Sequence, residues 1–477
     1  MAYSESIPKN YQLPHALVRI PAVHSFHYSV RMKRRPKAQV WTREEIQKVA
    51  EEGYIYGYPL VLMDVMRRVQ TAVPFPTTEA APLNQFSHSR FLPEPHTKEA
   101  VRPHADSLRS TAWLDVSPQP IVLRIPPMDR YYLLSIFSTW GDLFETMSPR
   151  TTGMEGSCVA FVGPNWHGRL PDGIKLLAAP TDTLWINGRI QAAGVEELQI
   201  VHFKQDQFHL TPLSEWGKPP STHPCPFPPD LDRQMTPEQQ VESLTAPAFY
   251  TLLSRLIRKA PPQACDAPTI RRLAQIGFSS SEDFAFETLS SSTVQAMHAA
   301  VPEAQQTIAR AAEVPVMKVN NWSLPIHPRR FETDYLSRAV AARNAFWNSL
   351  AEDIVVYQTE LDKAGDSLKG THQYVIHFDQ EHVPPVNAFW SITVYDSRRL
   401  LPANAIHRHV LGDRDRLRLN PDNSLSIYIQ HEWPGTGKDS NWLPAPKAGF
   451  DLILQLYWPK SEVLNGMWRP PAVMRVR

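Results

Sequence analysis

A run of alternating residues near the C-terminus constrains the fold of this chain more than any other feature. Between Phe389 and Tyr395, large apolar side chains alternate with small polar ones, and Pro384-Pro385 stops the pattern from extending backwards. A period of two predicts a β-strand with one buried face. Similar runs occur at 374–378, 425–430 and 450–457. The C-terminal part is therefore predicted to be a β module of jelly-roll type.

Short alternating runs also fill the segment between Ala112 and Phe203. Pro-rich or Gly-rich turns separate these runs, which include 121–125, 131–137 and 199–203. Regularly spaced short strands are typical of a sandwich or barrel. This segment is therefore predicted to form another β module.

Helix signals occur before and between the two β regions. Thr42 and Glu45 form a capping box that predicts a helix through about Val69. A break near the middle of this helix is predicted by Gly53, Gly57 and Pro59. A second capping box, Thr236 with Gln239, begins a helix with an apolar side that extends to Leu256. Further helices are predicted near 269–276, 292–312 and 334–350.

The length of 477 residues exceeds what one hydrophobic core usually supports. The predicted fold class is α+β, mostly β, with two β-sandwich or jelly-roll-like modules and a helical region between them. The predicted organisation is an N-terminal extension (1–40), a helix plus β-sandwich module (41–218), a Pro-rich linker (219–235), a helical region (236–368) and a C-terminal jelly-roll-like module (369–477).

Composition argues against several kinds of partner. The formal net charge is +1, from 49 basic and 48 acidic residues, which gives no electrostatic reason to expect nucleic acid or an anionic membrane. No window reaches membrane-spanning length, and no apolar core of signal-peptide length precedes Trp41. The three cysteines, at 158, 225 and 265, are too far apart for a metal pair or a disulfide framework. A cytoplasmic protein is expected, and a homo-oligomer is left open.

Common cofactor and nucleophile motifs are absent from the sequence. It has no glycine-rich phosphate loop, dinucleotide fingerprint, nucleophile elbow or zinc-protease helix motif. Two histidines, His407 and His409, would share one face of a strand, and Asp413 follows them. Such a pair is only half of a metal site. No cofactor and no metal are therefore predicted, with a His-ligated metal enzyme as an alternative.

Several short segments together resemble a known family. They are, in chain order, 53–59, 84–88, 112–115, 130–132, 150–153, 163–166, 321–322 and 334–339. Their order is similar to that of a two-module family with paired domains of unknown function, numbered twelve-fifty-four and twelve-fourteen, over about Gly53 to Pro471. The resemblance implies a two-module architecture and leaves the substrate open.

The chain departs from that family in one segment. Where the family usually has Asn, Asp, Thr, Leu and Tyr in a line, this sequence has His104, Asp106, Ser107, Leu108 and Arg109. It also has Ser138 where an Asp usually precedes Trp140. If the segment lines a ligand site, these differences imply a ligand unlike that of a typical relative.

The same segment supplies the candidate catalytic residues. Asp106 could accept a proton or orient a hydroxyl, Arg109 could fix a carboxylate or stabilise an enolate, and His104 could titrate near neutral pH. Equally, Asp106 and Arg109 could simply pair across a turn. Tyr357, on a predicted helix, could present its hydroxyl to a cleft between the modules, although burial explains it as well.

Other residues are candidates for binding a substrate. Trp140, Trp390 and Trp442 could form stacking walls, or they could pack in cores. Arg150 could be an anion clamp or a structural tie. These groups favour a cofactor-independent enzyme of small-molecule metabolism that performs elimination, isomerisation, cyclisation or hydrolysis. A non-catalytic protein that binds a carbohydrate or lipid-like ligand is the second hypothesis.

Overall fold

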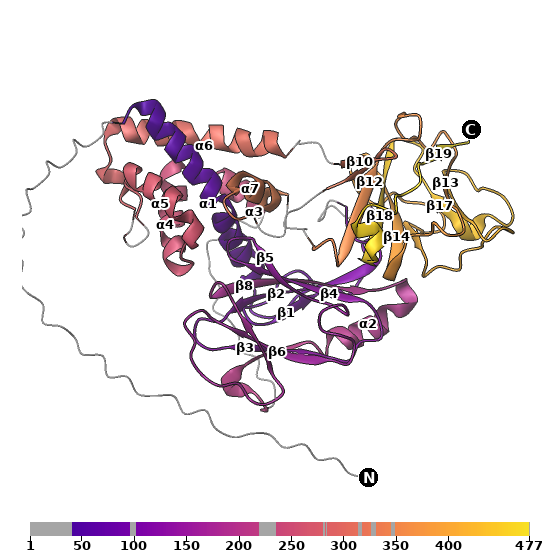
Figure 1. The fold of residues 1–477 in the computed structure, drawn as a ribbon, viewed down its shortest axis with the longest axis horizontal. Helices are drawn as coiled ribbons and strands as arrows, with labels where there is room; N and C mark the ends of the chain where they lie inside the picture. Colours follow the sequence, from indigo (N-terminus) through magenta and orange to yellow (C-terminus); the bar gives the residue numbers. More distant parts are fainter. Residues whose placement is uncertain are drawn as a thin grey trace, which may run out of the picture. The chain divides into compact units, whose positions relative to one another are not determined.

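The computed structural model describes residues 41–95, 102–218, 235–279, 282, 284–312, 317–325, 331–344 and 349–476. The elements below belong to the compact unit Thr42–Arg477 and are drawn in Figure 1. The predicted extension at 1–40 and nearly all of the predicted linker at 219–235 lie outside the described residues.

The N-terminal module consists of two sheets that share one core. The first has the order β1-β2-β8-β4-β5, with β1 (Phe86–His88), β2 (Ser107–Asp115), β8 (Thr183–Gln191), β4 (Tyr132–Ser138) and β5 (Leu143–Met147). The second has the order β7-β6-β3-β9, with β7 (Lys175–Ala178), β6 (Ser157–Val162), β3 (Ile121–Ile125) and β9 (His209–Pro212). Alternate residues of both sheets, such as Leu108 and Leu123, form the core, so the module is a β-sandwich.

One predicted strand of this module is a helix. Residues 199–203 lie in α2 (Leu198–Gln205). The buried residues of α2 are Val201 and Gln205, whereas Ile200 and Phe203 are exposed. A spacing of four between buried residues is helical, and the short run was misread as alternation because it is rich in apolar residues.

The C-terminal module is a second sandwich. Its first sheet has the order β10-β11-β12-β18-β14-β15, with β10 (Met317–Val319), β11 (Trp322–Leu324), β12 (Ile354–Thr359), β18 (Phe450–Pro459), β14 (Val386–Asp396) and β15 (Val410–Gly412). Its second sheet has the order β17-β16-β13-β19, with β17 (Trp442–Pro444), β16 (Leu425–Gln430), β13 (Tyr374–Phe378) and β19 (Met474–Arg475). The two sheets enclose one apolar core.

Strand β14 is buried on both faces, so the prediction of one exposed face is wrong. Trp390, Ile392 and Val394 lie in the C-terminal core. The opposite face contacts the N-terminal module, where Phe389 packs against Tyr131. The second face is polar in part because it hydrogen-bonds across this contact and not because it faces water.

The helical region is built around α1 (Arg43–Thr71), which contacts α3 to α7 (Figure 1). These helices are α3 (Pro237–Glu242), α4 (Ala246–Lys259), α5 (Ala267–Leu273), α6 (Ser291–Ala311) and α7 (Tyr335–Arg343), and a short helix α8 (Ser461–Leu464) follows β18. Single 3₁₀ turns are η1 (Val195–Glu197), η2 (Leu213–Glu215), η3 (Ala264–Asp266), η4 (Ala274–Ile276), η5 (Phe286–Thr288) and η6 (Asp439–Asn441). The predicted α+β class with two sandwich modules and a helical region is therefore confirmed.

The predicted capping box of Thr42 and Glu45 is present, but the predicted break in α1 is not. The helix continues through Pro59 for 29 residues. Its glycines allow close packing, because a Cβ on Gly53 would lie 2.6 Å from the Leu273 side chain and one on Gly57 would overlap Leu253. Contacts with five neighbouring helices stabilise a helix that local propensity alone would interrupt.

The region predicted to be helical from 236 to 368 also contains strands. The helix that begins after Thr236 ends at Glu242, and α4 begins separately after Thr245. Strand β12 pairs with β18, so Tyr357 lies on a strand and not on a helix. Within the described ranges, no helix is long and apolar enough to cross a membrane. The cytoplasmic location and the homo-oligomer stay predictions.

Candidate ligand site on the outer face of the first sheet

Two arginines lie side by side on the first sheet. Arg109 on β2 is directly opposite Arg189 on β8 in the antiparallel register. Their neighbours Leu108 and Ile190 point into the sandwich core. Because successive side chains of a strand alternate between faces, both arginines lie on the opposite face. This outer face also carries Thr111, Asn187 and Ser135, which occupy matching register positions on β2, β8 and β4.

These polar side chains are enclosed, but they are not hydrogen-bonded. Thr111, Ser135 and Asn187 are all buried. Within the described ranges their side chains form no hydrogen bond, and neither does the Arg109 guanidinium. None of their polar atoms is among the buried side-chain atoms that lack a partner, so these atoms are accessible to water. An outer face with several unused donors and acceptors is therefore suited to a polar ligand or to ordered water.

Next to the arginines lies His104, which contacts three polar groups. The Arg189 guanidinium contacts its ring, Gln455 Nε2 lies 3.1 Å from its Nδ1, and Asp106 Oδ1 lies 3.9 Å from the same atom. The ring lies deep in the protein, yet 26% of its side-chain surface is exposed. A water-sized molecule can therefore reach part of the ring.

The environment of His104 keeps its imidazole neutral. Burial, followed by repulsion from the Arg189 charge, lowers the pKa of His104 well below its usual value. The expectation that His104 titrates near neutral pH is therefore wrong. A neutral imidazole can still accept a proton when an anion or a reacting group lowers the cost of its charge.

Asp106 connects the two modules. Its carboxylate accepts hydrogen bonds from Ser391 on β14 (2.7 Å), from the Tyr457 hydroxyl on β18 (2.9 and 3.0 Å) and from Ser107 (3.3 Å). Burial raises the pKa of Asp106, and the hydrogen bonds from Ser391 and Tyr457 oppose that rise. Asp106 and Arg109 form no ion pair, so the predicted local pair is not found. Both carboxylate oxygens are occupied, which fits a positioning role.

The electrostatics of the outer face favour an anion. Burial lowers the pKa of Arg109, Glu79 counteracts this effect, and Arg189 lowers the pKa further. Like charges directly opposite each other on neighbouring strands repel. An anionic group placed between the two guanidinium groups would relieve this repulsion and accept hydrogen bonds from Arg109.

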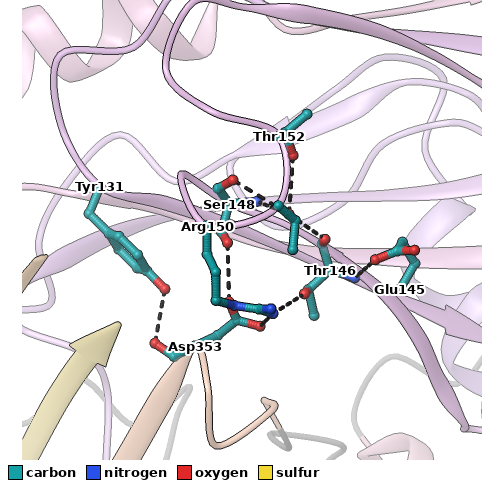
Figure 2. Close-up of polar contacts among 8 residues, drawn as sticks. Tyr131, Glu145, Thr146, Ser148, Arg150, Thr152 and Asp353 are labelled. Atoms are coloured by element: carbon teal, nitrogen blue, oxygen red, sulfur yellow. Dashed lines mark hydrogen bonds and ion pairs between the residues drawn. The ribbon is translucent and has the colours of Figure 1, made fainter. Parts of the chain in front are cut away.

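Arg150 is occupied by a carboxylate of the protein itself. Its Nε and one terminal nitrogen each lie 2.9 Å from an oxygen of Asp353, which is fully buried. Figure 2 shows Arg150 and Ser148 turned toward Asp353, whose backbone oxygen accepts a hydrogen bond from the Tyr131 hydroxyl. Of the two predicted roles for Arg150, these contacts support the structural tie.

The other predicted residues are not brought together with Arg109. Tyr357 and Trp390 are buried in the C-terminal core, against Trp468 and Phe378 respectively. Trp442 is buried on β17 and donates its indole N–H to the Gln430 carbonyl oxygen at 2.9 Å. Trp140 is buried beside Tyr56 in the turn after β4.

Sequence reasoning missed Arg189, Asn187 and Gln455. Arg189 and Asn187 are polar residues two apart in a largely apolar strand. Such a pattern is a usable signal, because a strand buried on both faces seldom places polar residues at successive same-face positions. Gln455 carried a similar signal within the apolar run of β18.

Comparison with known proteins agrees with this architecture. Residues 83–212 match the model of a protein of unknown function (DUF1254), and residues 353–461 match that of a protein of unknown function (DUF1214). The crystal structure of the VPA0106 protein from Vibrio parahaemolyticus is similar at 21% identity and a TM-score of 0.68, over 91% of this chain and 100% of that chain.

A putative uncharacterized protein from Burkholderia cenocepacia shares 11% identity at a TM-score of 0.41, over 90% of this chain and 93% of that chain. No curated protein matches the chain. The two model matches occur in the order and at the positions of the two sandwich modules. The chain therefore belongs to the two-module family in which a DUF1254 domain precedes a DUF1214 domain.

Proposed function

We propose that the protein is a cofactor-independent enzyme that transfers a proton on a small carboxylate-bearing molecule bound at the outer face. The observation that carries this proposal is the half-buried pair Arg109 and Arg189, directly opposite each other on neighbouring strands. Two guanidinium groups can hold a carboxylate and stabilise the extra negative charge of its enediolate.

The proposed step uses His104 as the base. The C–H bond next to the carboxylate breaks, its proton moves to an imidazole nitrogen of His104, and the electron pair enters the carboxylate held by the arginines. Return of the proton to the same or a neighbouring carbon completes an exchange or an isomerisation. Neutral His104 is in the protonation state that this step requires. Asp106 positions the segment through Tyr457 and Ser391.

The proposal can be tested without knowing the natural substrate. We expect the protein to catalyse exchange of the hydrogen next to the carboxylate in at least one member of a set of small carboxylic acids in D2O, followed by NMR. His104→Gln should slow this exchange by about 100-fold or more, which is the usual range for a general base. Arg109→Gln should weaken binding by about tenfold, because a charge-assisted hydrogen bond is lost.

Arg124→Gln is the matched control, because Arg124 is exposed on β3 of the other sheet. This variant should bind and exchange like the unchanged protein. Full exchange activity in His104→Gln would contradict the proposed base. Carboxylate binding that depends on Arg109 but never leads to exchange would instead support the non-catalytic ligand-binding hypothesis.

A further inference from the structure

A buried arginine lies in the helical region. Arg338 on α7 is only 2% exposed and is surrounded by three aromatic rings. The centre of its guanidinium lies 5.2 Å from the ring centroids of Trp140 and Tyr335 and 5.6 Å from that of Tyr56. Aromatic faces attract a cation and hold it in place, but they accept none of its hydrogen bonds.

Most of the hydrogen-bonding capacity of Arg338 is unused. Among the described residues its Nε and Nη2 have no hydrogen-bond partner, and Nη1 forms a long ion pair with Asp142 Oδ2, at 3.9 Å, which is beyond hydrogen-bonding distance. The carboxylate of Asp266 is already occupied, because it accepts hydrogen bonds from the hydroxyls of Tyr56 (3.2 Å) and Tyr335 (2.9 Å) and from the backbone N–H of Gln263 (2.9 Å). A buried charged group with missing hydrogen bonds is costly, so it requires an explanation.

The unused atoms define the shape of a partner. Nε–H and Nη2–H point in parallel from one edge of the planar guanidinium, and this edge matches the two oxygens of a carboxylate. Within the described ranges, three further donors at the end of β4 and in the turn after it are also buried without a partner: Ser138 Oγ, Thr139 Oγ1 and Trp140 Nε1. Of these residues, Trp140 has its ring beside Arg338, and its indole N–H is a further donor for the oxygens of an anion.

This position is separate from the Arg109 and Arg189 pair. On β4, the register partner of Arg189 is Leu133, and Ser138 lies at the far end of the same strand. Five residues of extended strand span about 16 Å, so a small carboxylate cannot reach both positions at once.

We propose that Arg338 binds the carboxylate of a small molecule through its Nε and Nη2 edge, with Tyr56, Trp140 and Tyr335 as the walls of the site. Neither nitrogen has appreciable exposed surface in the unliganded protein. Entry of the ligand therefore requires a wall residue to move. Trp140 lies on a turn, whereas Tyr56 and Tyr335 lie within helices, so we assign this movement to Trp140.

Binding can be measured with benzoate and acetate as probes, and with benzamide as the uncharged analogue, at constant ionic strength. We expect calorimetry to show binding of at least one of the two carboxylates, accompanied by a change in tryptophan fluorescence that disappears in Trp140→Phe. Arg338→Lys should weaken this binding at least tenfold, because lysine keeps the charge but loses the two-donor edge. Arg343→Lys, on the same helix but half-exposed and paired with Glu242, should bind normally.

Arg109→Gln separates this inference from the proposed function, because it should leave the Arg338-dependent binding intact. Loss of all carboxylate binding in Arg109→Gln together with full binding in Arg338→Lys would overturn the inference and leave the proposed function standing. Equal binding of benzamide and benzoate, or no binding of either carboxylate by the unchanged protein, would also overturn it. If Arg338→Lys does not fold, Trp140→Phe still tests the inference. A fluorescence change on carboxylate binding that persists in Trp140→Phe would overturn it.

Discussion

Neighbouring residues on one short segment have different roles in this protein. Asp106 is fully hydrogen-bonded to Ser391 and Tyr457, whereas Arg109, three residues later, has no side-chain hydrogen bond within the described ranges. The first arrangement is that of a residue that stabilises the fold, and the second leaves Arg109 able to bind the ligand that we propose. The sequence grouped both as catalytic candidates, because separation along the chain carries no information about the partner across the interface.

A half-buried histidine on β1 of the same sheet, His88, predicts a pH-dependent stability. Burial, with a smaller contribution from Arg90, lowers the pKa of His88 to about 4. The unfolded chain, with a histidine pKa of about 6.5, then binds more protons than the folded protein between these two values. The stability contributed by neutral His88 is complete above about pH 6.5 and is lost as the pH falls toward 4.

NMR titration of the His88 ring should give a folded-state pKa near 4. In urea unfolding, His88→Gln should reduce the slope of stability against pH between about 4 and 6.5 by at most about 1.4 kcal/mol per pH unit. His382→Gln, which changes an exposed histidine, serves as the control. A His88 pKa near 6.5, with an unchanged slope in the variant, would show that this histidine is not desolvated.

At the scale of elements, tertiary packing overrides what the local sequence predicts, both in a helix and in a strand. Pro59 does not break α1, because five helices pack around it. The alternation of β14 does not expose one face, because Ser391 and Tyr395 hydrogen-bond to the N-terminal module. The element types were predictable from periodicity and caps, but their burial depended on what packs against them.

The histidines near β15 illustrate the same point. His407 lies in a turn with a positive φ of 50°, and His409 precedes the strand, so the two do not share a strand face. His409 Nδ1 lies 3.3 Å from Asn404 Nδ2, and Asp413 Oδ1 accepts the backbone amide of Trp390 at 3.1 Å. Among the described residues, no group of three or more His, Cys, Asp or Glu is placed to hold a metal ion.

We therefore expect the double variant His407→Ala with His409→Ala to retain ligand binding and exchange activity, and chelation by EDTA to change neither. Metal analysis of the native protein by mass spectrometry provides the direct measurement. Stoichiometric iron, zinc or copper that disappears together with activity in the double variant would contradict this prediction and favour the metal-enzyme hypothesis.

At the scale of the whole molecule, a few polar contacts join the two sandwich modules. Arg150 and Ser148 of the N-terminal module hydrogen-bond to Asp353, at the start of the C-terminal module (Figure 2). In the same way, Asp106 of the N-terminal module accepts hydrogen bonds from Tyr457 and Ser391 of the C-terminal module. We therefore expect the unfolding of one module to be coupled to that of the other.

Asp353→Asn should destabilise the protein by about 2 kcal/mol. Removing one partner of a buried ion pair costs roughly 3–5 kcal/mol, and the partial exposure of Arg150, at 27% of its side-chain surface, reduces this cost. Calorimetry should show a single transition shifted to lower temperature. Asp366→Asn, which changes a mostly exposed partner of Arg475, should leave the transition in place. An unchanged transition in Asp353→Asn would mean that this contact does not couple the modules.

The sequence by itself determined the local elements and the family. The capping boxes at Thr42 and Thr236 predicted helix starts, and alternation predicted most strands of both sandwiches, because these signals depend on residues a few positions apart. Only the tertiary structure decided the candidate site. The pairing of Arg109 with Arg189 and the contact of Asp106 with Tyr457 depend on strand register and module packing, which bring together residues far apart in the chain.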